Sequence, residues 1–226
     1  RVTSHSRNVL TRRQASDPLR RTLTVLASRE NLPYVKDADG ATWRAYFFIE
    51  EAVTYDKIET ADQAREAARA FGEFQGFLVD LPGDRLHETI PKFHHTRSRF
   101  DALIRAVDAD TEGRAASVAD EIAFARSRES MVDELLDQQA LGELPERITH
   151  NDTKLNNVMF DTNSGEAICV IDLDTVMPGL VLYDFGDMVR TATSPALEDE
   201  KDLSLVRMQM PMFQALAEGY VGATRS

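Results

Sequence analysis

Apolar residues near the start of the chain recur at the three- and four-residue spacing of a helix. Residues 1–30 are therefore predicted to be largely helical, with a break at Pro18. The apolar positions of this stretch are Val9, Leu10, Leu19, Leu23 and Leu26.

A short β pattern follows this stretch. Residues 32–35 and 43–49 are rich in aromatic and β-branched side chains, and they flank a turn-forming segment at residues 36–40. This arrangement predicts two paired strands. Residues 50–52 come directly after the second strand.

The middle of the chain is predicted to be helical. Thr60 and Gln63 form a capping-box pattern, so a long helix is expected to begin at Thr60 and to end before the Leu-Pro-Gly sequence at 81–83. Its apolar face contains Ala64, Ala67, Ala68, Phe71 and Leu78. Two more helices are expected at residues 96–108 and 115–140. The inward-facing positions of the second are Val118, Ile122, Val132, Leu135 and Leu136.

A β-rich segment is predicted to begin near Pro145. It contains Ile148, a strand at 157–160, a turn at 161–165 and a second strand at 167–171. These two strands are expected to form a hairpin.

Helical patterns return at residues 184–191 and 202–221. The order of elements predicts two lobes that meet near residues 50–58, the second of them mainly helical.

Composition excludes several classes of function. A hydrophobic fraction of 42% supports a folded core and argues against disorder. The formal net charge is -12, from 38 acidic and 26 basic residues, which disfavours nucleic acid and anionic membranes as partners. Cys169 is the single cysteine, so it cannot form an intrachain disulfide, and its apolar neighbours indicate a buried thiol. No apolar segment is long enough to span a bilayer and no signal peptide is seen, so we expect a soluble cytoplasmic protein.

The strongest chemical signal is the sequence His-Asn-Asp-Thr-Lys-Leu-Asn-Asn, which begins at residue 150. Asp152 is the candidate general base for a hydroxyl proton, and Lys154 is the candidate cation for the γ-phosphate. Asn157 and Asp172 are the candidate Mg²⁺ ligands, because both supply hard oxygen atoms and the predicted hairpin would bring them together. These parts match the needs of phosphoryl transfer.

Two further residues are interpreted as structural support. His150 is expected to be a buried scaffold whose ring bonds the backbone that carries Asp152. Asp184 begins an Asp-Phe-Gly triplet, the metal-binding sequence of protein kinases, but Asp172 already supplies the carboxylate. Asp184 is therefore expected to cap the following helix and to anchor the catalytic loop.

Residues 161–166 resemble part of a calcium-binding loop. The run is too short, lacks the late bidentate Glu and joins two strands, so we interpret it as a plain β-turn. The sequence contains no glycine-rich phosphate loop of either common form.

The motif resembles that of the phosphotransferase family that includes aminoglycoside phosphotransferases and choline, homoserine and methylthioribose kinases. The family pattern H-x-D-x-x-x-x-N matches His150, Asp152 and Asn157, and the later Ile-Asp pair matches residues 171–172. The longer strings at 150–161, 170–179 and 183–190 look most like the N-acetylhexosamine 1-kinase branch.

This resemblance implies an α+β, bilobal, protein-kinase-like fold with ATP in the cleft between the lobes. The adenine would lie against the backbone of Glu50, Glu51 and Ala52. The acceptor would be the anomeric hydroxyl of an N-acetylhexosamine, with Mg²⁺ as the cofactor. Contacts with the sugar are expected from Asp174, Asp187 and Arg190.

The resemblance also implies a division into lobes. Residues 1–55 would be a partial, truncated N-terminal lobe that lacks the Gly-rich loop and the phosphate-binding Lys. Residues 56–226 would be a mainly helical C-terminal lobe with the catalytic hairpin. We expect residues 1–226 alone to bind ATP weakly and to turn over poorly.

Two alternatives remain open at this point. One is a kinase for another alcohol acceptor, such as choline, homoserine, thiamine or an aminoglycoside. The other is a non-catalytic, kinase-like ligand-binding module. The presence of Asp152, Asn157 and Asp172 argues against the second.

Overall fold

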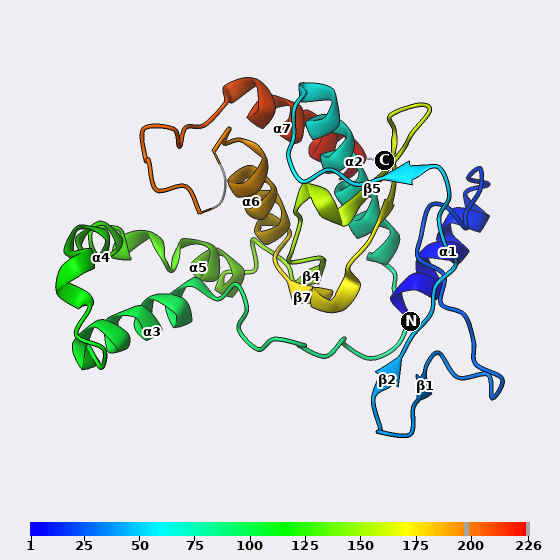
Figure 1. Ribbon diagram of the computed structural model, residues 1–226, viewed down its shortest axis with the longest axis horizontal. Coiled ribbons are helices and arrows are strands. Elements are labelled where there is room, and N and C mark those ends of the chain that lie inside the picture. The colour runs from blue at the N-terminus through cyan, green and yellow to red at the C-terminus, as the bar shows by residue number, and fades with distance from the viewer. Residues whose placement is uncertain (197–198, 225–226) are drawn as a thin grey trace.

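The computed structural model describes residues 1–196 and 199–224. It combines helices with small antiparallel sheets. A central body of helices and strands lies between a helical arm at one end and an extended hairpin at the other (Figure 1). The chain starts with α1 (Val2–Arg12). The prediction that residues 1–30 are largely helical is wrong beyond α1, because Gln14 and Asp17 adopt left-handed backbone angles, with φ of 55° and 50°. Turns therefore replace the expected helix.

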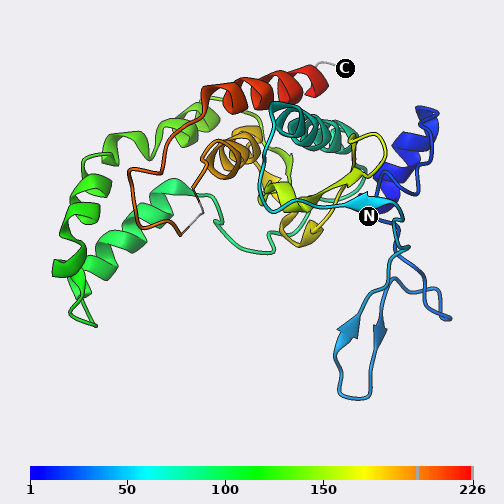
Figure 2. The same ribbon diagram turned by 45° about the horizontal axis from the view of Figure 1, so that its top comes forward.

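The predicted strand pair is present but short. It consists of β1 (Val35–Lys36) and β2 (Thr42–Trp43), which are antiparallel and joined by a turn that includes Gly40 at φ 84°. Asp37 closes this turn by accepting the Ala41 backbone N–H and the Trp43 indole N–H. The hairpin projects from the body (Figure 2).

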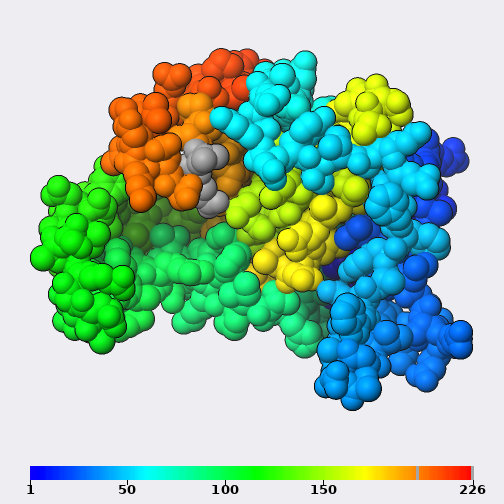
Figure 3. Space-filling view, viewed as in Figure 1, coloured from blue at the N-terminus to red at the C-terminus, as the bar shows by residue number. Residues whose placement is uncertain are grey.

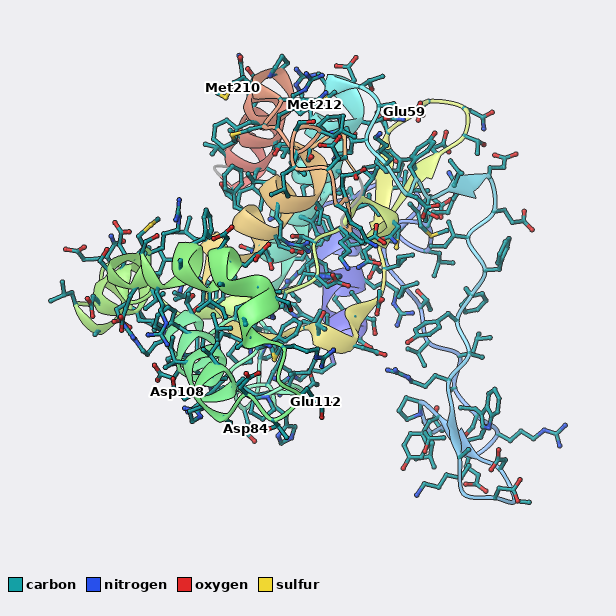
Figure 4. All side chains as sticks on the ribbon, turned by 60° about the vertical axis from the view of Figure 1, so that its left-hand side comes forward. Glu59, Asp84, Asp108, Glu112, Met210 and Met212 are labelled. Atoms are coloured by element: carbon teal, nitrogen blue, oxygen red, sulfur yellow. The ribbon has the colours of Figure 1, made fainter. Side chains whose placement is uncertain are left out.

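The hydrophobic core forms where α2 (Ala61–Leu78) and α7 (Met210–Thr224) cross. The capping box predicted at the start of α2 is confirmed, because Gln63 N donates to Thr60 Oγ1 while Gln63 Oε1 accepts from Thr60 N. Close helix approach depends on Gly219, where a side-chain methyl group would overlap the carbonyl oxygen of Arg65. Glu59 just before α2 and Met210 and Met212 at the start of α7 lie at the same end of the body (Figure 4).

A three-stranded sheet packs against α2. Its order is β3 (Ala52–Val53), β5 (Val158–Asp161) and β6 (Ala167–Val170), all antiparallel. The hairpin predicted from residues 157–171 is therefore confirmed. Val158 and Phe160 are fully buried against the helical core.

The helical arm contains α3 (Thr96–Ala109), α4 (Ala119–Arg126) and α5 (Glu134–Ala140). The prediction for α3 is confirmed. The single helix predicted over residues 115–140 is wrong, because short 3₁₀ segments η1 (Ala115–Val118) and η2 (Glu129–Met131) interrupt it. None of its five expected inward-facing residues is buried, and Val118 is 43% exposed.

The segment that carries the candidate catalytic residues follows a strand of a second small sheet. The strand β4 (Arg147–Thr149) pairs antiparallel with β7 (Met177–Gly179), and α6 (Val181–Ala192) follows. Two more 3₁₀ turns are η3 (Leu155–Asn157) and η4 (Leu173–Thr175). The helix expected at 202–221 starts only at Met210, after a turn segment fixed by a bond from Gln209 N to Thr193 O.

Across residues 1–196 and 199–224, none of the helices combines the length and the apolar character that crossing a bilayer would require.

Candidate active site

The loop between β4 and β5 brings Asp152, Lys154 and Asn157 together. Asn157 Nδ2 donates to the backbone carbonyl of Asp152 at 2.8 Å and to its carboxylate Oδ2 at 3.1 Å. Lys154 Nζ lies 3.7 Å from Asp152 Oδ1. The Asp152 side chain is 30% exposed, so its carboxylate is fixed by the protein and open to a ligand. Most of this loop is buried, and part of it reaches the surface between the helical arm and residues 50–58 (Figure 3).

His150 connects the two acidic segments. Its ring is fully buried between the edges of Phe71 and Phe74, whose centroids lie 5.3 and 5.8 Å away. The backbone N–H of Asp152 donates to Nδ1 at 3.3 Å, so Nε2 carries the proton and donates to the carbonyl of Ile171 at 2.9 Å. The imidazole therefore links the backbone of Asp152 to that of Ile171, the residue that precedes Asp172. These are the contacts expected of a structural scaffold.

Asp184 is the buried anchor of the loop. Its carboxylate accepts the backbone N–H groups of His150 and Asn151 at 2.9 and 2.7 Å, and the Gln75 amide at 2.6 Å. Burial raises the pKa of Asp184, while these donors stabilise its charged form and oppose that rise. The expectation that Asp184 caps α6 is wrong, because α6 begins at Val181 and Asp184 lies in its first turn.

Asp172 lies at the end of β6, beside Asn157. The backbone N–H of Ile171 donates to the carbonyl of Asn157 at 2.9 Å, which continues the hairpin ladder to the metal-ligand candidates. Asp172 has a left-handed φ of 56° and is exposed. A non-glycine residue with this angle is uncommon outside turns and sites. Among the described residues, no side chain donates to its carboxylate.

The three candidate sugar-binding residues already have protein partners. Asp187 accepts the backbone N–H of Thr153 at 2.8 Å and pairs with Arg190 at 2.8 Å. Asp174 pairs with Arg44 at 3.0 Å on the surface. Asp187 thus supports the loop between β4 and β5, and Asp174 lies near β2.

A cavity of about 540 Å³ opens beside the loop between β4 and β5. Lys154, Leu155 and Asn156 line one side of it, residues 56–58 a second, and Arg190 with parts of residues 191–206 the remainder. Its volume is in the range of pockets that bind small molecules.

Residues 50–52 form the connection between the hairpin region and the body. The carbonyl of Glu50 accepts from Arg20 at 2.9 Å, and the carbonyl of Glu51 accepts from Thr162 N at 3.0 Å. Ala52 pairs with Asp161 in the ladder of β3 and β5.

Several residues that hold the loop were not predicted from the sequence. Gln75 and Asn151 are buried, and the Asn151 amide donates to the carbonyls of Thr149 and Thr175 at 3.2 and 3.0 Å. His94 Nε2 donates to the carbonyl oxygen of Asn151 at 2.9 Å. Gln75 could have been predicted from the sequence, because a polar residue on the apolar face of a helix is expected to have a buried hydrogen-bond partner.

Two of the predicted site residues, Asn157 and Asp172, carry oxygen atoms that could bind a metal ion. Because Asn157 Nδ2 is bonded to Asp152, its Oδ1 points away and can accept a cation. Within the described part of the chain, no group of three or more His, Cys, Asp or Glu side chains could hold a metal ion. One amide and one carboxylate suit Mg²⁺, which usually completes its shell with phosphates and water.

The sequence model of the phosphotransferase enzyme family matches residues 10–210. The chain belongs to the phosphotransferase enzyme family. The fold of this phosphotransferase is similar to a solved aminoglycoside phosphotransferase from Alicyclobacillus acidocaldarius, with 13% identity and a TM-score of 0.53. The match covers 98% of this chain and 68% of that one. The predictions of the family and of an α+β, kinase-like fold are therefore confirmed. The N-acetylhexosamine 1-kinase branch stays a prediction.

Proposed function

We propose that this phosphotransferase is an ATP-dependent kinase that phosphorylates a hydroxyl group of a small molecule. Residues 1–55 contribute to its N-terminal lobe, and residues 56–226 form its C-terminal lobe. The observation that carries this proposal is the Asp152 carboxylate, which Asn157 holds at 3.1 Å beside Lys154 and a cavity. A carboxylate held in this way has the position that a general base needs.

Asp152 orients the acceptor hydroxyl and takes its proton. The hydroxyl oxygen then forms a bond to the γ-phosphorus while the bond between that phosphorus and the bridging oxygen breaks, and ADP leaves. Lys154, 3.7 Å from Asp152, neutralises charge that develops on the transferred group. His150 and Asp184 keep the loop in place through buried hydrogen bonds.

Asn157 and Asp172 are the residues that would hold Mg²⁺. When bound, the ion neutralises phosphate charge and orients the phosphates for in-line transfer. The hydrogen bonds of Asn157 support this role, because they direct its amide oxygen away from Asp152. Asp172 is exposed and directly follows Ile171, whose backbone N–H donates to the carbonyl of Asn157.

The connecting residues Glu50, Glu51 and Ala52 are proposed to line the adenine site. The acceptor is proposed to enter the cavity next to Lys154, where Arg190 forms part of the wall. We propose the anomeric hydroxyl of an N-acetylhexosamine as the acceptor, on the basis of the branch-like strings at 150–161 and 170–179. Asp174, Asp187 and Arg190 would contact the sugar after exchanging their present protein partners.

A second candidate acceptor is an aminoglycoside, because the similar solved structure is described as an aminoglycoside phosphotransferase. The cavity lining weakens this candidate. It contains the cations Lys57, Lys154 and Arg190 against the acids Asp56 and Glu200. A polycation would gain little attraction from such a wall.

The test is a panel assay with the full-length gene product, ATP and Mg²⁺. Release of ADP is followed with N-acetylglucosamine, N-acetylgalactosamine, choline, homoserine, thiamine and kanamycin as acceptors. We expect acceptor-dependent ADP release with an N-acetylhexosamine and its loss in Asp152→Asn with the fold retained. Full activity of Asp152→Asn would reject its role as the base.

A further inference from the structure

The turn that resembles a calcium loop is occupied by protein contacts. Asp161 Oδ1 accepts the backbone N–H groups of Asn163 and Ser164 at 2.9 and 2.8 Å. Gly165 follows at φ 75°, which closes the turn. Asn163 Nδ2 donates to Glu51 Oε2 at 3.3 Å. Asp161 Oδ1 is therefore bonded within the turn, while the Asn163 side chain faces the connection at residues 50–52.

Arg20 reaches the same place from a distant part of the chain. Its Nη2 lies 2.9 Å from the Glu50 carbonyl oxygen, 3.3 Å from that of Glu51 and 2.9 Å from Asp161 Oδ2. The Arg20 side chain is 30% exposed and the Asp161 side chain 12% exposed, so the ion pair is partly shielded from water. Shielding strengthens such a pair relative to a surface one.

The connection between the two regions is thus held from both sides. Arg20 contacts it from the loop after α1, and Thr162 N donates to the Glu51 carbonyl from the turn after β5. Glu51 itself has a left-handed φ of 52°, a conformation that a Glu keeps only when neighbouring contacts impose it.

We infer that Arg20 is a positioning residue for the nucleotide base, because its guanidinium fixes the backbone of residues 50–52 against the β5–β6 turn. This inference rests on the proposed function, in which that backbone lines the adenine site. Arg20 does not contact the phosphates or the acceptor in this account. Its removal loosens the carbonyls of Glu50 and Glu51 and leaves the catalytic loop unchanged.

A purely structural role makes a different prediction. If Arg20 only stabilises the fold, its loss lowers the melting temperature and leaves ligand affinity unchanged well below that temperature. If it positions the base, affinity for a base-containing ligand falls while affinity for the bare phosphate chain stays constant. The two roles are therefore separable by comparing two ligands.

The experiment is isothermal titration of the full-length protein with Mg·ADP and with Mg·tripolyphosphate, at a temperature where circular dichroism shows every variant folded. For Arg20→Gln we expect Mg·ADP binding about tenfold weaker, as for loss of one charge-assisted hydrogen bond. Tripolyphosphate binding should change less than about twofold. Arg21→Gln is the matched control, since Arg21 is the next residue and its nearest carboxylate, on Glu166, is 3.9 Å away.

Arg20→Lys keeps the charge but loses the planar fork, and should give an intermediate affinity for Mg·ADP. If Arg20→Gln does not fold, Arg20→Lys replaces it in the comparison of Mg·ADP and Mg·tripolyphosphate affinities. Wild-type affinity for Mg·ADP in a folded Arg20 variant would overturn the inference alone, as would an equal loss for both ligands. Failure of the wild type to bind Mg·ADP would instead reject the proposed function, and the inference with it.

Discussion

The carboxylate of Asp184 lies 2.7 Å from the backbone nitrogen of Asn151 and accepts its hydrogen bond inside the core. The other oxygen accepts His150 N at 2.9 Å and Gln75 Nε2 at 2.6 Å. One side chain in the first turn of α6 thus connects the catalytic loop with α2. Removing an acceptor of this kind lowers the free energy of unfolding, because water cannot reach the buried donors to replace it.

We expect Asp184→Asn to lower the free energy of unfolding by about 2–4 kcal/mol, because the new amide group faces N–H donors with an N–H of its own. Urea unfolding followed by circular dichroism measures the effect. Asp174→Asn is the control, since its carboxylate is 75% exposed and surface ion pairs contribute little. Equal stability of Asp184→Asn and Asp174→Asn would contradict the proposed anchor.

The crossing of α2 and α7 supplies a second prediction. A methyl group at Gly219 would overlap the backbone of Arg65, whereas one at Gly222 meets nothing within 4 Å. We expect Gly219→Ala to destabilise the protein by about 2 kcal/mol or more through overpacking. Gly222→Ala should be neutral or stabilising by up to about 1 kcal/mol, since Ala favours a helix. The melting temperatures of the two variants, measured by thermal unfolding, test this prediction. Similar melting temperatures would mean that α2 and α7 do not pack this closely.

The turn at Asp161 predicts a dependence of stability on pH. The Ser164 N–H and the Arg20 guanidinium lower the pKa of Asp161 from 3.8 to about 2. A carboxyl whose pKa is lower in the folded state stabilises the fold above its unfolded pKa and loses that contribution as the pH falls. The stability difference between wild type and Asp161→Asn should therefore be constant above about pH 5 and shrink between pH 4 and pH 2. The midpoints of urea unfolding of the two proteins, measured across this pH range, test the prediction. A stability difference that does not depend on pH would count against the ion pair.

The sequence was most informative where the signal is local. The capping box at Thr60 and Gln63 involves neighbouring residues, and the β5–β6 hairpin follows from one turn between two apolar runs. Both were predictable because the contacts that decide them are short in range. The candidate motif at 150–157 is likewise contiguous, which explains why Asp152 and Asn157 could both be identified from the sequence as candidate site residues.

Contacts between distant segments were not predictable in the same way. Arg20 and Asp161 lie 141 residues apart, and nothing in either segment indicates the other. The arm at 115–140 also escaped prediction, because its short helices have no side-chain caps and little buried surface to enforce one long helix. The left-handed Gln14 ended the first predicted helix with no Gly or Pro beside it, whereas the left-handed Asp17 precedes Pro18, where a break was predicted.

The most direct test of the central claim is binding of Mn²⁺, as a substitute for Mg²⁺, measured by electron paramagnetic resonance with the full-length protein and ADP. Asp172 and Asp174 are both exposed carboxylates in one Ile-Asp-Leu-Asp sequence, and only Asp172 is proposed to hold the metal. The account predicts at least about tenfold weaker Mn²⁺ binding in Asp172→Asn and wild-type binding in Asp174→Asn. Equal Mn²⁺ affinities for Asp172→Asn, Asp174→Asn and the wild type would contradict it.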